Sequence, residues 1–188
     1  MIVQTNDSEF SLVTKRYLRC YYGILDCMMY KMTSVRMGDS ISCNFIVQMI
    51  PHHCAAIEMA RNLLCYTTDL ALQEIALGII REQTKGIRGM RQMLSSCARV
   101  QNTQQQVCQY QESLFHITRT MFADMKNSCA VNDINRSFIN EMIPHHRGAV
   151  LMAKNALDFP ICPCLVPVLN TIITSQQQGI CEMEALLP

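Results

Sequence analysis

Residues 45–53 read Phe-Ile-Val-Gln-Met-Ile-Pro-His-His, and residues 138–146 read Phe-Ile-Asn-Glu-Met-Ile-Pro-His-His. The second stretch follows the first at an offset of 93 positions. At this offset residues 45–94 align with residues 138–187 without an insertion, and 20 of the 50 aligned pairs are identical. Similarity at one fixed offset indicates that the chain is a duplication of one unit.

Each unit is expected to contain three helices and no strands. Sustained period-two alternation and hairpin dipeptides such as Asn-Gly are missing, and Asp39 or Ser40, Asp69 and Asp133 are good helix-capping residues. The expected helices cover about residues 8–35, 40–65 and 69–96 in the first unit and about 104–127, 133–157 and 165–186 in the second. We therefore predict an all-α fold.

The expected organisation is a first repeat unit over residues 1–97, a Gln- and Asn-rich connector over 98–107, and a second unit over 108–188. A chain of 188 residues is long enough to bury a sizeable core without disulfides or metals. The two units together are expected to form one compact bundle domain.

Charge and hydropathy argue against two classes of partner. The net charge is +1 with no basic run, which does not fit nucleic-acid binding. Apolar stretches are too short to cross a bilayer, and Met1–Asp7 lacks the pattern of a signal peptide. An odd number of cysteines, 11, argues for a reducing compartment, so we expect a cytoplasmic protein.

Histidine and methionine fall on the apolar faces of the expected helices. Helical periodicity predicts that the second helix of the first unit buries Phe45, Met49, His52, His53, Ala56, Met59, Ala60 and Leu63. It predicts a buried face on the third helix with Leu72, Ile79, Gln83, Ile87, Met90 and Leu94, which recurs as Leu165, Ile172, Gln176, Ile180, Met183 and Leu187.

Neutral imidazole is a common metal ligand, and thioether sulfur favours Cu(I) or Ag(I) over hard cations. Both His pairs and five Met pairs match at the offset, whereas no Cys matches another Cys. The candidate ligands are therefore Met49, His52, His53, Met59, Met90, Met142, His145, His146, Met152 and Met183. Weaker candidates are Met28, Met32, Gln83, Met121, Met125 and Gln176. Cu(I) is the expected ion, with Ag or Zn as alternatives, but such methionine stripes can also be ordinary core filling.

Pro51 and Pro144 lie inside expected helices, where proline removes a backbone N–H and disturbs the preceding turn. One hypothesis is that each proline aims the following His pair inward. The alternative is a bend that only improves packing.

The stretches Met49-Ile-Pro-His-His-Cys-Ala-Ala-Ile-Glu-Met-Ala60 and Met142-Ile-Pro-His-His-Arg-Gly-Ala-Val-Leu-Met-Ala153 resemble the hallmark of the DUF305 family. The family's third-helix pattern is similar to Gln83, Ile87 and Met90 and to their counterparts in the second unit. The resemblance implies a ferritin-like bundle of four core helices plus two additional helices. It also implies copper or silver binding and tolerance, as in some members.

Two positions depart from that family pattern in both units. Ser42 and Asn135 stand where the family commonly has an acidic residue, and Gly86 and Gly179 stand where it commonly has Glu. A ferritin-like di-iron site needs several Glu, so hard-metal oxidase chemistry is not expected. The paired glycines suggest close helix approach.

The cysteines offer a weaker signal for soft metals, from Cys20 and Cys27, from Cys54, and from Cys162-Pro-Cys164. Three functions stay open from the sequence. The leading one is soft-metal binding for sequestration, buffering or tolerance without catalytic residues or an organic cofactor. The others are a metal-dependent redox enzyme and a helical interaction module that binds no metal. Expected partners are the metal ion, a metal-donor protein or a second copy of the chain.

Overall fold

The computed structural model describes residues 10–128 and 130–187. It contains α1 (Leu12–Thr33), α2 (Ile41–Leu64), α3 (Leu70–Cys97), α4 (Gln104–Lys126), α5 (Ile134–Leu157) and α6 (Val166–Glu184). These ranges contain no strand, so the all-α prediction is confirmed. The expected start of the first helix near residue 8, and the segment Met1–Asp7, lie outside the described residues.

Side-chain caps set where several helices begin. Ser40 accepts a hydrogen bond from the backbone N–H of Cys43, and Asp69 accepts one from Leu72 N–H at 3.0 Å. Asp133 caps α5 in the same way, at 3.2 Å from its donor nitrogen. These caps satisfy backbone donors that the first helical turn leaves free. The expected helix starts at these residues are confirmed.

A capping box marks the end of the connector between α3 and α4, at the start expected for the helix over residues 104–127. Thr103 and Gln106 form a capping box, in which each side chain accepts a hydrogen bond from the other residue's backbone N–H. This reciprocal cap starts α4 at Gln104. Residues 104–107, expected in the connector, are therefore helical.

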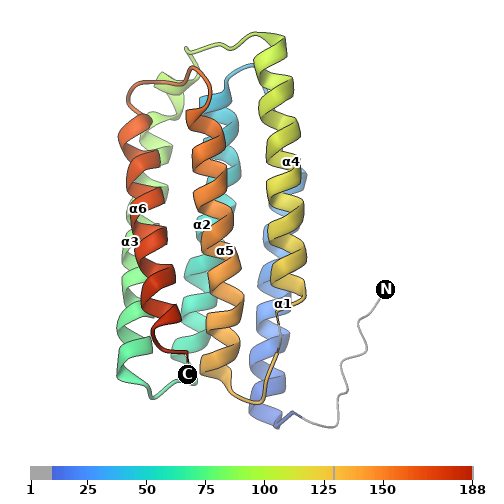
Figure 1. Ribbon diagram of the computed structural model, residues 1–188, viewed down its shortest axis with the longest axis vertical. Helices are drawn as coiled ribbons and strands as arrows, with labels where there is room; N and C mark the ends of the chain where they lie inside the picture. Colours follow the sequence, from blue (N-terminus) through green and yellow to red (C-terminus); the bar gives the residue numbers. More distant parts are fainter. Residues whose placement is uncertain (1–9, 129, 188) are drawn as a thin grey trace.

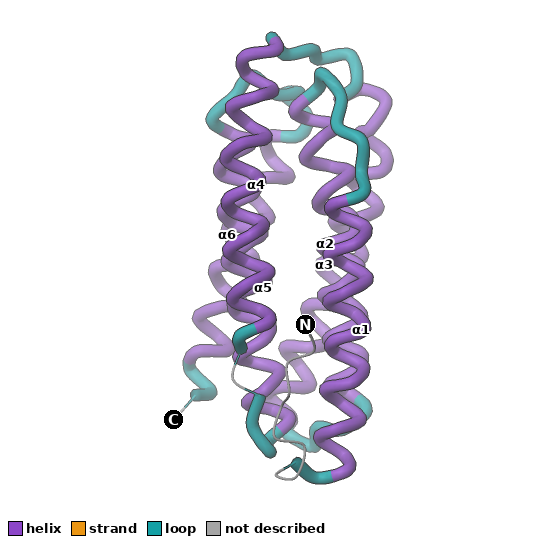
Figure 2. Tube along the Cα trace, turned by 90° about the vertical axis from the view of Figure 1, so that its right-hand side faces the viewer, coloured by secondary structure: helices purple, strands orange, loops and turns teal. Residues whose placement is uncertain are grey.

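Each half of the chain packs as three helices in a row, with α2 between α1 and α3, and α5 between α4 and α6. In Figure 1 the two rows lie one behind the other, with α2 and α5 in the middle, α3 and α6 on one side and α1 and α4 on the other. Contacts close a ring through α2, α3, α6 and α5, while α1 packs on α2 and α4 packs on α5. Viewed at right angles, the three helices of each half form one layer (Figure 2). The structure thus has four core helices and two additional ones; a ferritin-like relationship stays a prediction.

Equivalent residues of the two halves make equivalent contacts. The side-chain amide of Asn62 donates to the backbone oxygen of Tyr17 at 3.1 Å, and Asn155 donates to Tyr110 at 3.2 Å. Both residues of the second pair lie 93 positions after those of the first. The duplication is therefore preserved in the packing of the outer helices against the central pair. None of the described helices has the length and apolarity that a membrane span requires.

Candidate metal centre

Four imidazoles meet where α2 and α5 pack in the middle of the bundle. The ring centroids of His52 and His145 lie 3.7 Å apart with the planes tilted by 34°. Both residues have no exposed surface, and His53 and His146 are 2% exposed. The prediction that the His pairs turn inward is confirmed, and the first His of each unit contacts its counterpart.

Most of the ring nitrogens have no hydrogen-bond partner. Five of the eight are buried without a partner, whereas His145 Nε2 lies 3.1 Å from the backbone oxygen of His52. A carbonyl oxygen only accepts, so this Nε2 carries the proton and the lone pair of His145 is on Nδ1. The buried ring nitrogens without a partner are His52 Nδ1 and Nε2, His53 Nδ1, His145 Nδ1 and His146 Nδ1. Buried polar atoms normally have partners, so this concentration favours a ligand site.

Burial keeps these imidazoles neutral. It lowers the pKa of His53 to about 3 and that of His145 to about 4. The pKa values of His52 and His146 are also lowered well below 6.5, first by burial and then by the neighbouring histidines. Neutral imidazole is the form that ligates a metal ion, so all four rings are ready as ligands near neutral pH.

Glycine lets α3 and α6 approach the outer imidazoles. A Cβ added at Gly86 would lie 2.9 Å from His53 Nε2, and one added at Gly179 would lie 3.1 Å from His146 Cδ2. The close helix approach that the paired glycines suggested is confirmed. The rings of His53 and His146 therefore lie in the space that a side chain at Gly86 or Gly179 would occupy.

A groove between α3 and α6 gives access to this side of the imidazole cluster. Its volume is about 260 Å³, and His53, Gln83 and Gln176 contribute to its lining. The Oε1 atoms of Gln83 and Gln176 are buried without a hydrogen-bond partner. Two carboxamide oxygens therefore join the unpartnered ring nitrogens on this side of α2 and α5.

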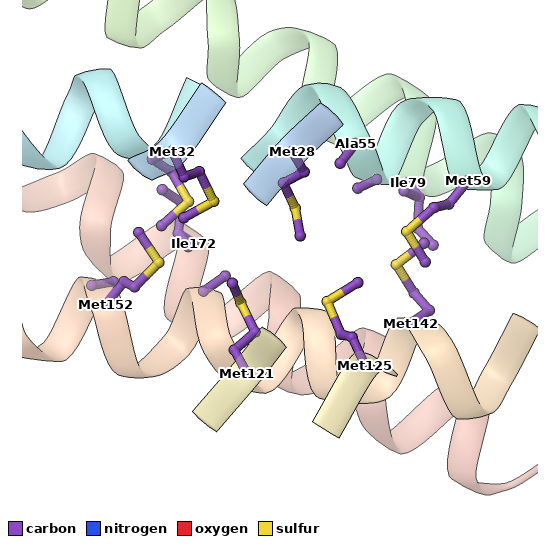
Figure 3. Close-up of a cluster of buried hydrophobic side chains, with 14 of the residues drawn as sticks. Met28, Met32, Ala55, Met59, Ile79, Met121, Met125, Met142, Met152 and Ile172 are labelled. Atoms are coloured by element: carbon purple, nitrogen blue, oxygen red, sulfur yellow. The ribbon is translucent and has the colours of Figure 1, made fainter. Parts of the chain in front are cut away.

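The methionines form a buried thioether layer between the central pair and the outer helices α1 and α4. In Figure 3, Met59 and Met142 point toward one another, as do Met32 and Met152. Met28 from α1 and Met125 from α4 point into the space between these pairs. The expected ligands in this layer are all buried: Met28, Met32, Met49, Met59, Met121, Met125, Met142 and Met152.

One methionine contact differs between the halves. Met121 lies against Gly148, where an added Cβ would clash with its Sδ atom. The corresponding residue in the first unit is Ala55, close to Met28 in Figure 3. The missing side chain at Gly148 lets the thioether of Met121 approach the backbone of α5. The two halves of the layer are therefore related without being identical.

A buried carboxyl group lies in the second half, and the sequence analysis missed it. Glu141, one turn before His145, accepts a hydrogen bond from the Tyr17 hydroxyl at 2.5 Å. Burial raises the pKa of Glu141 to about 8. Its counterpart in the first unit, Gln48, donates to the backbone oxygen of Met32 instead. The signal available in the sequence was the Gln-to-Glu change inside the repeated motif.

The structure buries every expected ligand, including Met90, Met183, Gln83 and Gln176. It does not gather the imidazoles into one coordination sphere. Among the described residues, the only His, Cys, Asp and Glu ligand atoms that form a group of three within 4.8 Å of one another belong to Cys97, Cys162 and Cys164. A site at the histidines would therefore combine one or two imidazoles with thioether or carboxamide donors.

A sequence model of the family described as "Domain of unknown function (DUF305)" matches residues 42–187. No curated protein is similar in sequence at a significant level. Solved structures with the same arrangement of helices include "CopM in the Ag-bound form (by soaking)". It is 28% identical with a TM-score of 0.58, over 77% of this chain and 92% of that chain.

A second similar structure is "CopM in the Cu(II)-bound form", which is 28% identical with a TM-score of 0.57, over 77% of this chain and 94% of that one. A third is a DUF305 fragment from Deinococcus radiodurans. It is 24% identical with a TM-score of 0.57, over 78% of this chain and 94% of the fragment, and it supports the fold alone.

Proposed function

Because the chain belongs to the DUF305 family, we propose that it binds a soft metal ion, Cu(I) or Ag(I), in buried pockets of imidazole and thioether. The binding serves sequestration, buffering or tolerance and requires no catalysis. The metal is held in one pocket in each half or in one shared site where α2 and α5 meet, since His52 contacts His145 across the two halves. The proposed ligands are Met49, His52, His53, Met59 and Met90 in the first half and Met142, His145, His146, Met152 and Met183 in the second.

The observation that carries the proposal is the set of buried ring nitrogens without hydrogen-bond partners around His52 and His145. Leaving a buried polar atom unpaired costs about 1–3 kcal/mol. A bound ion would satisfy several of these atoms at once. Ordinary core histidines would be expected to hydrogen-bond to the surrounding backbone instead.

The donor set favours a soft ion. Glu141 is the only buried carboxyl group among the described residues, and Tyr17 already donates to it. Hard cations prefer several oxygen ligands, whereas thioether and imidazole suit Cu(I) and Ag(I). The form of CopM with Ag supports a soft ion, and its form with Cu(II) supports copper as the element. For this chain the thioether layer favours Cu(I).

We place this activity in a reducing compartment, the cytoplasm, where copper is held as Cu(I) and thiols stay reduced. Every described cysteine is a free thiol. A metal-donor protein or a second copy of the chain are the partners that such a role would involve.

Anaerobic titration with Cu(I) against a competing chelator tests the proposal. The wild-type protein should bind Cu(I) stoichiometrically, and a variant with His52, His53, His145 and His146 replaced by Gln should lose the equivalents of Cu(I) that the imidazole and thioether pockets hold. Thermal unfolding should shift to higher temperature when Cu(I) is added to the wild type, because a ligand that binds only the folded state stabilises it.

His116, the remaining histidine, is exposed and provides the matched control. A His116→Gln variant should bind Cu(I) like the wild type. Circular dichroism at equal concentration establishes that the four-His variant is still helical. A folded four-His variant that binds as many equivalents of Cu(I) as the wild type would contradict the assignment of the imidazoles.

A further inference from the structure

Three thiols converge at the end of the bundle where α3 ends and α6 begins. Cys97 is the last residue of α3, and Cys162 and Cys164 flank Pro163 in the loop between α5 and α6. Figure 1 shows that loop and the end of α3 at the same end of the molecule. The three Sγ atoms lie within 4.8 Å of one another, and those of Cys162 and Cys164 are 2.9 Å apart.

Hydrogen bonds to the start of α2 hold both thiol-bearing segments. Ser40 Oγ donates to the backbone oxygen of Cys97 at 2.9 Å. The backbone N–H of Cys162 donates to Ser42 Oγ at 2.8 Å. Two neighbouring serines therefore fix the two segments relative to each other. Ser42 occupies a position where the family pattern commonly has an acidic residue, and here it positions the thiol loop.

We propose that Cys97, Cys162 and Cys164 form a three-thiolate site for Cu(I), separate from the imidazole and thioether pockets. Thiolates select soft ions such as Cu(I) and Zn. Three sulfurs at about 2.3 Å from one ion lie about 4 Å apart, which falls between the shortest separation here and the 4.8 Å limit. Binding releases the thiol protons.

Coordination number decides between the two ions. Structural Zn is almost always four-coordinate, and no fourth His, Cys, Asp or Glu ligand among the described residues joins this group. Cu(I) does not require a fourth ligand in addition to three thiolates. Cys97 and Cys162 are buried while Cys164 is exposed, so a donor can reach the site from one side.

Among the described residues the thiol site occurs once, unlike the duplicated histidine and methionine motif. At the offset of 93, the residues that correspond to Cys162 and Cys164 are Asp69 and Ala71. Asp69 instead caps α3 at the opposite end of that helix. The expected stoichiometry is therefore one thiolate-bound Cu(I) for each chain, in addition to the ions held by histidine and methionine.

Anaerobic Cu(I) titration of the full chain, followed by ultraviolet thiolate-to-Cu(I) charge transfer, tests the site. A Cys97→Ser/Cys162→Ser/Cys164→Ser variant should lose one equivalent of Cu(I) and the charge-transfer band. The control is a Cys20→Ser/Cys108→Ser variant, which changes two exposed thiols outside the cluster and should keep both. The four-His variant should also keep the band, which separates this proposal from the preceding one.

Alkylation of the wild type provides a second measurement, which does not depend on whether a variant folds. Cu(I) at 100 times the Kd should slow alkylation of Cys97, Cys162 and Cys164 about 100-fold and leave Cys20 and Cys108 unprotected. Equal alkylation with and without Cu(I) would overturn the proposal. So would a triple-Ser variant with full Cu(I) stoichiometry.

Discussion

Gly86 of α3 faces the imidazole of His53 so closely that a Cβ added at Gly86 would lie 2.9 Å from Nε2. The ring position therefore depends on the absence of a side chain on the neighbouring helix. Gly89, one turn further along α3, has open space above it. The two glycines allow the contact with the ring to be separated from the general effect of glycine in a helix.

Gly86→Ala should push the His53 ring out of place and weaken Cu(I) binding about 10- to 100-fold, which is the usual effect of disturbing a group that orients a metal ligand. Gly89→Ala should leave Cu(I) affinity unchanged and raise the free energy of unfolding by up to about 1 kcal/mol, because alanine favours the helix. Competition titration and urea unfolding of both variants measure these effects. Equal Cu(I) affinities in the two variants would contradict the positioning role of Gly86.

Much of the fold follows from the helical periodicity of short segments. The repeat at an offset of 93 indicates that the helices of one unit recur in the other, and periodicity places His52, His53 and Met59 on a buried face, as the structure confirms. Capping chemistry at Asp69 and Asp133 locates two helix starts. These properties depend on residues within a few turns of one another, which is why sequence reasoning reaches them.

The site depends on contacts that no local pattern contains. The stacking of His52 on His145 requires the packing of α2 against α5. The approach of Cys97 to Cys162 requires the end of α3 and the loop between α5 and α6 to meet at one end of the bundle. The helical pattern of α5 does not reveal that the carboxyl of Glu141 receives its hydrogen bond from α1.

Tyr17 and Tyr110 occupy equivalent positions but have different partners. The Tyr17 hydroxyl donates to Glu141, whereas the buried Tyr110 hydroxyl has no hydrogen-bond partner. Tyr17→Phe should lower the free energy of unfolding by about 1–3 kcal/mol, because it leaves the carboxyl group unpaired. Tyr110→Phe should be neutral or stabilise by up to about 1 kcal/mol. Chemical unfolding at pH 7 compares them, and a larger loss for Tyr110→Phe would contradict this assignment.

The buried imidazoles should make the metal-free protein sensitive to acid. Their folded pKa values, about 3 for His53 and about 4 for His145, lie below the ordinary value of 6.5. Between these values the unfolded chain binds more protons than the folded one, so stability is lost as pH falls below 6.5. Replacing the four core histidines by Gln should make the free energy of unfolding depend less steeply on pH below 6.5. If this pH dependence is as steep in the variant as in the wild type, other groups cause it.

Glu141 should produce the opposite slope above neutrality. Its folded pKa of about 8 exceeds the ordinary value of 4.5, so the folded state binds the extra proton between these values. Its stabilising contribution is complete below about pH 4.5 and is lost as pH rises through 8. With the histidines neutral above pH 6.5, stability should decline from there to about pH 8. Glu141→Gln should abolish this decline in urea unfolding across that range, and persistence of the decline would exclude Glu141 as its cause.

Met59 and Met142 point toward one another across the central helix pair (Figure 3), which makes them the sharpest test of the thioether ligands. Leucine fills a similar volume without a sulfur atom, so Met59→Leu/Met142→Leu should cost less than about 1.5 kcal/mol for each change. Cu(I) affinity should nevertheless fall about tenfold or more, equivalent to about 1.4 kcal/mol. Met93, half-buried and not repeated at the offset, provides the Met93→Leu control. If the double variant keeps wild-type affinity in the chelator competition, the thioethers are core filling and only the nitrogen and thiolate donors hold metal.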